Sequence, residues 1–313
     1  MALEYARVLQ ALAYRIHVIG RGASSARTFY KKTGIPVWTE GLDTWWKRHG
    51  TASVTAAIVA VNAEQLASVA LALLRRGMKR ILVEKPAGLN EEELLSLVRE
   101  AEARRADVYV AYNRRHYASV LAARRMIEAD GGVRSVHFDF TEYSRRIAAS
   151  SIHRDVKEAW LVANSSHVID LAFYLAGEPV MLESLCTGEL PWHRRASRFC
   201  GCGLTRSGAL FSYHANWEAP GNWSIEVTTA KRKMRLQPLE QLAVQSEEGG
   251  PMESISLDQE LDLRFKPGLY RLVQTFLSGA KDPSLMPVRT QLERYRDVYT
   301  PMLARSVSRK PDR

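Results

Sequence analysis

Residues 15–112 alternate short apolar runs with segments of helical pattern, and this alternation restricts the fold more than any other feature of the sequence. The apolar runs predict strands at 15–20, 35–38, 56–61, 81–84 and 108–112. Helices are predicted at 3–13, 24–32, 42–49, 63–77 and 90–105. Strands that alternate with helices form a parallel sheet covered by helices on both faces. We therefore predict an α/β domain over residues 1–113.

The pattern changes from Arg114 onward, where strands follow one another without intervening helices. Alternating or apolar runs predict strands at 133–143, 180–187, 197–204, 208–217, 222–230 and 232–236. Helices are predicted at 116–128, 159–176, 267–279 and 289–305, and the last residues, 308–313, are expected to be frayed. Such runs of strands predict a second, α+β domain over residues 114–313, with a mostly antiparallel sheet.

Composition excludes several classes of protein. The net charge is +10, but the basic residues are scattered and no basic run carries interleaved aromatics, so we expect no nucleic-acid partner. No apolar run reaches 18 residues, and Glu4 and Arg7 interrupt the N-terminal apolar stretch, so neither a membrane span nor a signal peptide is predicted. Three cysteines favour a reducing, cytoplasmic location. Cys200 and Cys202 lack the spacing of a zinc site, and no metal is predicted.

A charged pair ends the fourth predicted strand. The run Ile81–Val83 leads into Glu84 and Lys85, and Pro86 then ends the strand because it has no N–H for the ladder. In open α/β sheets, ligands bind at the carboxyl edge of the strands. From position alone, Lys85 is equally well explained as a surface cation or as a proton donor that anchors a ligand.

Three stretches carry a resemblance to a known family. The first is EKPAG at 84–88, the second is AYNRRHYAS at 111–119, and the third is NSSHVIDLAFYLAG at 164–177. In this order they resemble the glucose-fructose oxidoreductase / inositol dehydrogenase / MocA (Gfo/Idh/MocA) family. The resemblance implies a Rossmann-like domain and a dehydrogenase or reductase that uses NADP or NAD. It also implies hydride transfer at a CH–OH carbon of a sugar-like substrate, and a dimer or tetramer. The arginines at 145, 146 and 154, described below, suggest in addition a phosphorylated or nucleotide-linked sugar, with a solvated loop as the alternative.

The stretch Gly20-Arg21-Gly22 raises a question of alignment, because with Ala23, Ser24 and Ser25 it resembles an interrupted G-x-G-x-x-G loop. If it is that loop, strand 15–20 is the first of its domain, and Glu40 is the acid that binds the ribose. The interval to Lys85 is then about one βαβ unit too short. We favour strand 15–20 as the second strand, so that the first strand and its glycine loop are missing from these 313 residues. A late start codon, a truncated gene and a degenerate domain all stay open.

The resemblance implies which residues of the first domain bind the cofactor. Arg21 would follow the second strand and meet the 2′-phosphate of NADP, with help from Arg27 or Lys31. Asn62, Glu84, Lys85 and Asn113 would lie along the nicotinamide half, although Asn113 is equally suited to cap the helix at 116–128.

The third stretch implies the substrate site. His167 matches the pocket histidine of the family and would share acid–base work with Lys85. The family's acid one turn earlier is replaced by Ala163, so the usual carboxylate is missing. Asn164 and Asp170 share or border the face of His167 and are predicted to bind substrate, with Asp170 also suited to orient the histidine.

Four side chains before the helix at 159–176 complete the prediction. They are Arg145, Arg146, His153 and Arg154, of which Arg154 is predicted to contact substrate phosphate or carboxylate groups. The alternative function is a non-catalytic ligand sensor or a truncated relative. The lost loop and Ala163 favour that alternative, whereas the retained Lys85 and His167 favour the enzyme.

Overall fold

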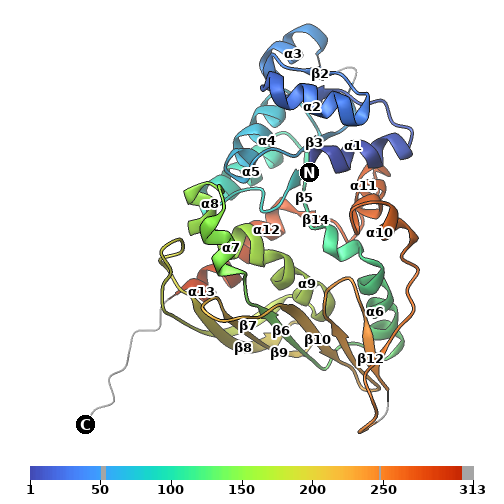
Figure 1. Ribbon diagram of the computed structural model, residues 1–313, viewed down its shortest axis with the longest axis vertical. Helices are drawn as coiled ribbons and strands as arrows, with labels where there is room; N and C mark the ends of the chain where they lie inside the picture. Colours follow the sequence, from blue (N-terminus) through green and yellow to red (C-terminus); the bar gives the residue numbers. More distant parts are fainter. Residues whose placement is uncertain (51–53, 247, 305–313) are drawn as a thin grey trace. The chain divides into compact units, whose positions relative to one another are not determined.

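The computed structural model describes residues 1–50, 54–246 and 248–304 and divides into two compact units (Figure 1). Unit 1 comprises Met1–Gly88, Glu92–His116 and Glu260–Gln291. Unit 2 comprises Leu89–Glu91, Tyr117–Gln259 and the chain from Leu292 onward. The terminal segment predicted to fray lies outside the described residues, as does the last residue of the helix predicted at 289–305.

Unit 1 contains the predicted alternation of strands and helices. Its strands are β1 (Val18–Ile19), β2 (Val37–Trp38), β3 (Ala57–Val59), β4 (Arg80–Glu84), β5 (Asp107–Ala111) and β14 (Met286–Pro287). Its helices include α1 (Ala2–Ala11), α2 (Ala23–Thr33), α3 (Gly41–His49), α4 (Leu66–Arg75), α5 (Glu91–Ala103), α10 (Glu260–Arg264) and α11 (Leu269–Leu277). Short 3₁₀ turns, η1 (Ala63–Gln65) and η2 (Asn113–His116), follow β3 and β5. The prediction of a Rossmann-like parallel α/β domain is confirmed.

The sheet of unit 1 is divided into two pieces. β1 pairs in parallel with β2, and a separate sheet has the order β14-β5-β4-β3, in which β3, β4 and β5 are parallel. In the doubly wound strand order 3-2-1-4-5-6, the first strand lies between the second and the fourth. Ile58 of β3 is only half-buried, whereas Ile81 and Leu82 of β4 are fully buried. The division therefore supports the alignment in which β1 is the second strand of the domain.

Helix α1 begins at the carboxyl edge of the larger sheet. Tyr5, near its start, donates a hydrogen bond to Glu84 at the end of β4. Tyr5 and Val8 also join an apolar cluster with Leu82 and Tyr109. Helix α11 packs into the same cluster through Leu269, Leu272, Val273 and Phe276. The segment Glu260–Gln291 therefore belongs to unit 1, although the sequence had placed it in a second domain over 114–313.

Unit 2 is built on one large sheet with the strand order β13-β12-β11-β10-β6-β9-β8-β7. Its strands are β6 (Ser135–Phe140), β7 (Pro179–Thr187), β8 (Arg198–Thr205), β9 (Leu210–Asn216), β10 (Trp223–Thr228), β11 (Lys233–Leu236), β12 (Ala243–Gln245) and β13 (Glu253–Ser254). All neighbours are antiparallel except β6 and β9. This confirms the predicted mostly antiparallel sheet.

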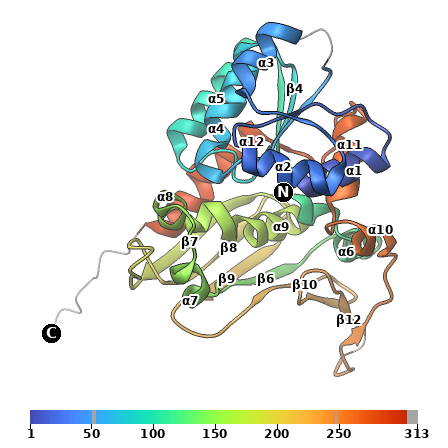
Figure 2. The ribbon, with the colours of Figure 1, turned by 45° about the horizontal axis from the view of Figure 1, so that its top comes forward.

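Helices cover one face of this sheet, as Figure 2 shows for α9 (Ser166–Ala176). The alternation Val136, Phe138, Phe140 directs these side chains into the core, where Phe138 packs edge-on against Phe173 of α9. The helix predicted at 159–176 is divided, because a π turn (Leu161–Ser165) precedes α9. The remaining helical segments are α6 (Ala118–Ala129), α7 (Ser144–Ala149), α8 (Arg154–Glu158), α12 (Val288–Arg294), the π turn η4 (Tyr295–Tyr299) and α13 (Thr300–Leu303).

Two further observations bear on function. No helix among the described residues combines the length and the apolar character that crossing a bilayer requires. Likewise, in the described part of the chain, no group of three or more His, Cys, Asp or Glu side chains could hold a metal ion.

The divided sheet makes a prediction about hydrogen exchange. Backbone amides on the β1-facing edge of β3 (Ala57–Val59) have no strand partner among the described residues, so we expect them to exchange much faster than those of Ile81–Val83 in β4. Amide exchange followed by mass spectrometry measures both strands in one experiment, and β4 is the internal control. Equal protection of the two strands would show that the edge of β3 is covered.

Candidate active site

The charged pair Glu84–Lys85 lies where the sequence predicted, at the carboxyl end of β4. Both residues are half-buried, and the peptide bond from Lys85 to Pro86 is cis. The phenol of Tyr5 donates to Oε1 of Glu84 at 2.7 Å. Burial, reinforced by the negative charge of Glu84, raises the pKa of Tyr5 well above its ordinary value. Tyr5 therefore stays a hydrogen-bond donor and fixes the Glu84 carboxylate beside Lys85.

A second set of hydrogen bonds holds the turn that follows. Gln291, fully buried, donates from Nε2 to the carbonyl of Pro86 at 3.3 Å and accepts from the Tyr112 hydroxyl at 3.0 Å. The cis turn after β4 and the end of β5 are thus joined through one side chain. Lys85 consequently projects from a backbone that is restrained on both sides, which suits a residue that must meet a ligand with defined geometry.

The other predicted cofactor residues also follow strand ends. Arg21 is exposed after β1, and Asn62 is exposed before η1. Asn113 is buried at the start of η2, and its Nδ2 donates to the carbonyl of Pro267 at 2.9 Å. Asn113 therefore anchors the segment before α11, which is a role the sequence did not predict.

The residues after β1 do not form a close-packed phosphate loop. Gly22 has an ordinary φ of −97°. A Cβ on Gly20 would meet Val37 Cγ1 at 3.4 Å, and one on Gly22 would meet Ser25 Oγ at 3.5 Å, both normal contacts. Neither glycine is required by packing or by backbone conformation. In the described residues, no strand leads into a glycine cradle that could hold the pyrophosphate of a dinucleotide, and cofactor binding by Arg21, Asn62 and Asn113 stays a prediction.

In unit 2, the predicted residues Asn164 and His167 lie on successive turns of the helical segment 161–176. His167 is 6% exposed, and its ring centroid lies 6.3 Å from that of Trp223 on β10. Ser166 is fully buried, and its hydroxyl has no hydrogen-bond partner in the described chain. Burying an unsatisfied hydroxyl costs about 1–3 kcal/mol, so this turn is not arranged for stability alone.

The structure supplies a carboxylate that the sequence analysis missed. Glu142, two residues beyond β6, is 6% exposed and accepts hydrogen bonds from Ser165 Oγ at 2.7 Å and from Asn164 Nδ2 at 3.2 Å. Position 163 of the helix is an alanine, so the helix supplies no carboxylate at that position. The carboxylate of Glu142 comes from the segment after β6 instead. The alternation Phe138, Phe140, Glu142 could have revealed it, because it places Glu142 on the core side of the strand.

Asp170 has a structural partner. Arg294 of α12 pairs with the Asp170 carboxylate, and both side chains are about fully buried. Arg294 also donates from Nη2 to Glu178 at 2.5 Å. Although burial by itself lowers the pKa of Arg294, the two carboxylates raise it above its ordinary value. The ion pair explains why a carboxylate is buried here, and substrate binding by Asp170 stays a prediction.

The basic side chains that precede the π turn are on the surface. Arg154 is exposed at the first position of α8, where the side chain of His153 caps the helix. Arg145 and Arg146 are exposed on α7. These cations are accessible to a solution anion, and contact between Arg154 and substrate stays a prediction.

Comparison with known proteins identifies the first part of the chain. Residues 3–112 match the model of the oxidoreductase family with an NAD-binding Rossmann fold, GFO_IDH_MocA. The first part of the chain is therefore similar to the Gfo/Idh/MocA oxidoreductase family. The resemblance carried by Glu84-Lys85-Pro86 is thereby confirmed, and the predicted cofactor class agrees with the NAD binding of this family. No curated protein matched the chain by sequence.

Solved structures share the fold of this chain across nearly its whole length. A UDP-N-acetylglucosamine 3-dehydrogenase from Acidithiobacillus ferrooxidans is 15% identical, with a TM-score of 0.73, over 96% of this chain and 94% of that one. An aldose-aldose oxidoreductase from Caulobacter crescentus is 17% identical, with a TM-score of 0.73, over 92% and 89%. An Agrobacterium radiobacter oxidoreductase, in complex with NAD⁺, L-tartaric acid and magnesium, is 11% identical, with a TM-score of 0.75, over 96% and 93%.

The buried ion pair allows a stability prediction. Arg294→Met leaves the Asp170 carboxylate buried without its cation, so we expect the free energy of unfolding to fall by about 3–5 kcal/mol. Arg48→Met, which breaks an exposed pair with Glu40, should cost less than about 1 kcal/mol. Urea unfolding measures both. A loss below about 1 kcal/mol for Arg294→Met would show that Asp170 is not held as a buried anion.

Proposed function

We propose that this protein is an NAD(P)-dependent oxidoreductase that transfers a hydride to or from a CH–OH carbon of a sugar or sugar derivative. The observation that carries the proposal is the placement of Lys85 at the carboxyl end of β4, in residues that match an NAD-binding oxidoreductase family. Dehydrogenases and oxidoreductases that act on nucleotide sugars and aldoses share its fold. The cofactor supplies the hydride chemistry, and the protein supplies position and proton transfer.

In this proposal Lys85 hydrogen-bonds the reacting oxygen and helps to move its proton. Its backbone is restrained through Gln291 and Tyr5, so the ammonium group is offered in one geometry. His167 shares the acid–base work, and Asn164 positions the substrate. Asn62, Glu84 and Asn113 contribute to the cofactor site, and the exposed Arg154 is available for a phosphorylated or nucleotide-linked substrate.

Arg21 provides the argument for NADP. It is an exposed guanidinium directly after the second strand of the domain, where a 2′-phosphate would lie. The alternative ribose acid, Glu40, forms an exposed ion pair with Arg48 at 2.9 Å and belongs to an alignment that the divided sheet does not support.

A fluorescence titration with NADPH and NADH tests these proposals together. We expect NADPH to bind more tightly, and Arg21→Asp to weaken NADPH binding by about 10–100-fold with little effect on NADH, because one charged hydrogen-bonding group is lost. Lys47→Asp, at an exposed cation of α3, is the matched charge control. Lys85→Met should retain NADPH binding and lose turnover of UDP-N-acetylglucosamine or an aldose. Equal or tighter binding of NADH by the wild type would refute the NADP preference.

A second candidate is a non-catalytic ligand sensor, or a truncated relative, on the same fold. The divided sheet and the lack of a glycine cradle in the described residues favour it. If a folded sample binds neither NADPH nor NADH, the result supports this second candidate and contradicts the enzyme.

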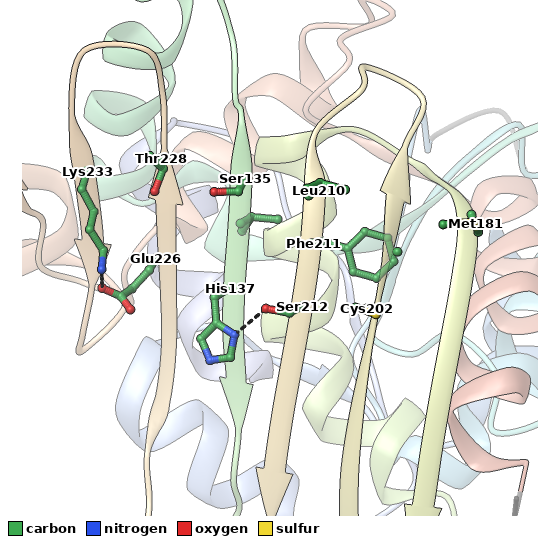
Figure 3. A pocket seen from close by; sticks show the side chains of 12 residues that line it. Ser135, His137, Met181, Cys202, Leu210, Phe211, Ser212, Glu226, Thr228 and Lys233 are labelled. Carbon is green, nitrogen blue, oxygen red and sulfur yellow. Dashed lines mark hydrogen bonds and ion pairs between the residues drawn. The ribbon is translucent and has the colours of Figure 1, made fainter.

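We infer that the open face of the unit 2 sheet joins two copies of the chain. Met181, Leu185 and Leu210 expose 53%, 58% and 61% of their surface there. Met181 and Leu210 line a depression of about 530 Å³ in which His137 contacts Ser212 and Glu226 contacts Lys233 (Figure 3). Exposed apolar patches of this kind commonly mark protein interfaces.

Sedimentation velocity tests the assembly. We expect the wild type to sediment as a dimer or tetramer and Leu185→Lys with Leu210→Glu to shift it toward monomer, because two charges would be buried in the interface. The double variant Arg145→Glu with Arg146→Glu changes exposed residues of α7 and serves as the control. A monomeric wild type at micromolar concentration would rule out this interface.

A further inference from the structure

A carboxylate occupies a core position at the end of β6. Phe138 and Phe140 point into the core of unit 2, and Glu142 continues the same alternation. Its two oxygens accept hydrogen bonds from Asn164 Nδ2, both at 3.2 Å, and Oε1 also accepts from Ser165 Oγ at 2.7 Å. Buried carboxylates with directed donors remain ionised, because the donors stabilise the charged form. Glu142 therefore places a negative charge inside unit 2.

The donors to this carboxylate come from the π turn. Asn164 and Ser165 are adjacent in Leu161–Ser165, and the wider π turn presents both side chains to one acceptor. Single π turns within α-helices are frequent at functional sites. The next hydroxyl, Ser166 Oγ, is buried and has no hydrogen-bond partner among the residues that the structure describes. Polar groups are thus concentrated on this turn beyond what packing requires.

His167 lies in the first turn of α9, directly after Ser166. Trp223, whose ring lies near the imidazole, pairs with Phe140 across β10 and β6, so the strand ends that carry Trp223 and Glu142 are neighbours. The other core-facing side chains of these two strands are apolar. Asp170, on the same helix, is paired with Arg294, and Arg296 and Asp297 of η4 are exposed.

We propose that Glu142 is a positioning residue of the substrate site, which orients the Asn164 amide and places a negative charge beside Asn164, the residue that precedes His167 by about one helical turn. The proposal rests on the proposed function only in assuming that His167 and Asn164 contact the substrate. The negative charge favours the imidazolium form of His167. A protonated imidazole donates from both ring nitrogens, so His167 is then a donor to a substrate oxygen.

The test is a histidine NMR titration, which needs neither cofactor nor substrate. His167→Gln assigns the resonance. We expect Glu142→Gln to lower the pKa of His167 by at least about half a unit, because the stabilising charge is lost, and Glu142→Asp to restore most of it. Glu183→Gln, which removes an exposed carboxylate on β7, should leave the pKa of His167 unchanged.

The outcomes separate this proposal from the proposed function. A folded Glu142→Gln variant with the wild-type titration of His167 overturns the role of Glu142, whatever the cofactor titration shows. If Glu142→Gln does not fold, ¹³C-glutamate spectra of the wild type, assigned with Glu142→Asp, decide instead. A Glu142 carboxylate that is ionised throughout the titration of His167 supports the proposal, and one that is protonated at neutral pH overturns it.

Discussion

Backbone hydrogen bonding in the sheet of unit 1 is the constraint on which the first half of the molecule depends. A buried strand must find partners for its N–H and C=O groups on both sides. β4 meets this requirement through β3 and β5, and it is the strand that carries Glu84 and Lys85. β1 and β3 meet it on one side each among the described residues. The residues with the best-fixed geometry are therefore those next to the intact part of the sheet.

The division of the sheet also separates the side chains that are predicted to bind a dinucleotide. Glu84 ends β4 and its carboxylate is held by Tyr5, while Lys85 precedes Pro86, whose carbonyl is held by Gln291. Asn113 follows β5, and its amide donates to the carbonyl of Pro267. Arg21 follows β1, in the smaller sheet. A pyrophosphate is usually held by backbone N–H groups of a glycine loop between these two positions. The side chains that are predicted to meet the two ends of a cofactor therefore follow strands of two different sheets, and the described residues form no glycine loop between them.

The core of unit 2 contains two buried carboxylates, Glu142 and Asp170. An apolar interior can hold a carboxylate only if donors or a cation accompany it. Asp170 has Arg294, and the pair connects α9 to α12. Glu142 has Asn164 and Ser165, and these contacts connect β6 to the π turn. On the helical segment 161–176, His167 lies between Asn164, which contacts Glu142, and Asp170, which pairs with Arg294.

The sequence by itself determined the alternation of strands and helices, the antiparallel second sheet, and the strand-end location of Glu84 and Lys85. These follow from hydrophobic periodicity and from proline, which act locally and can be read residue by residue. It also indicated that strand 15–20 is the second strand of its domain and not the first. Only the tertiary structure decided that Glu260–Gln291 packs on unit 1, that Asn113 and Asp170 have structural partners, and that Glu142 meets Asn164. The physical reason is that such contacts join residues 22 to 154 positions apart, and no local pattern encodes which distant side chains will share one buried space.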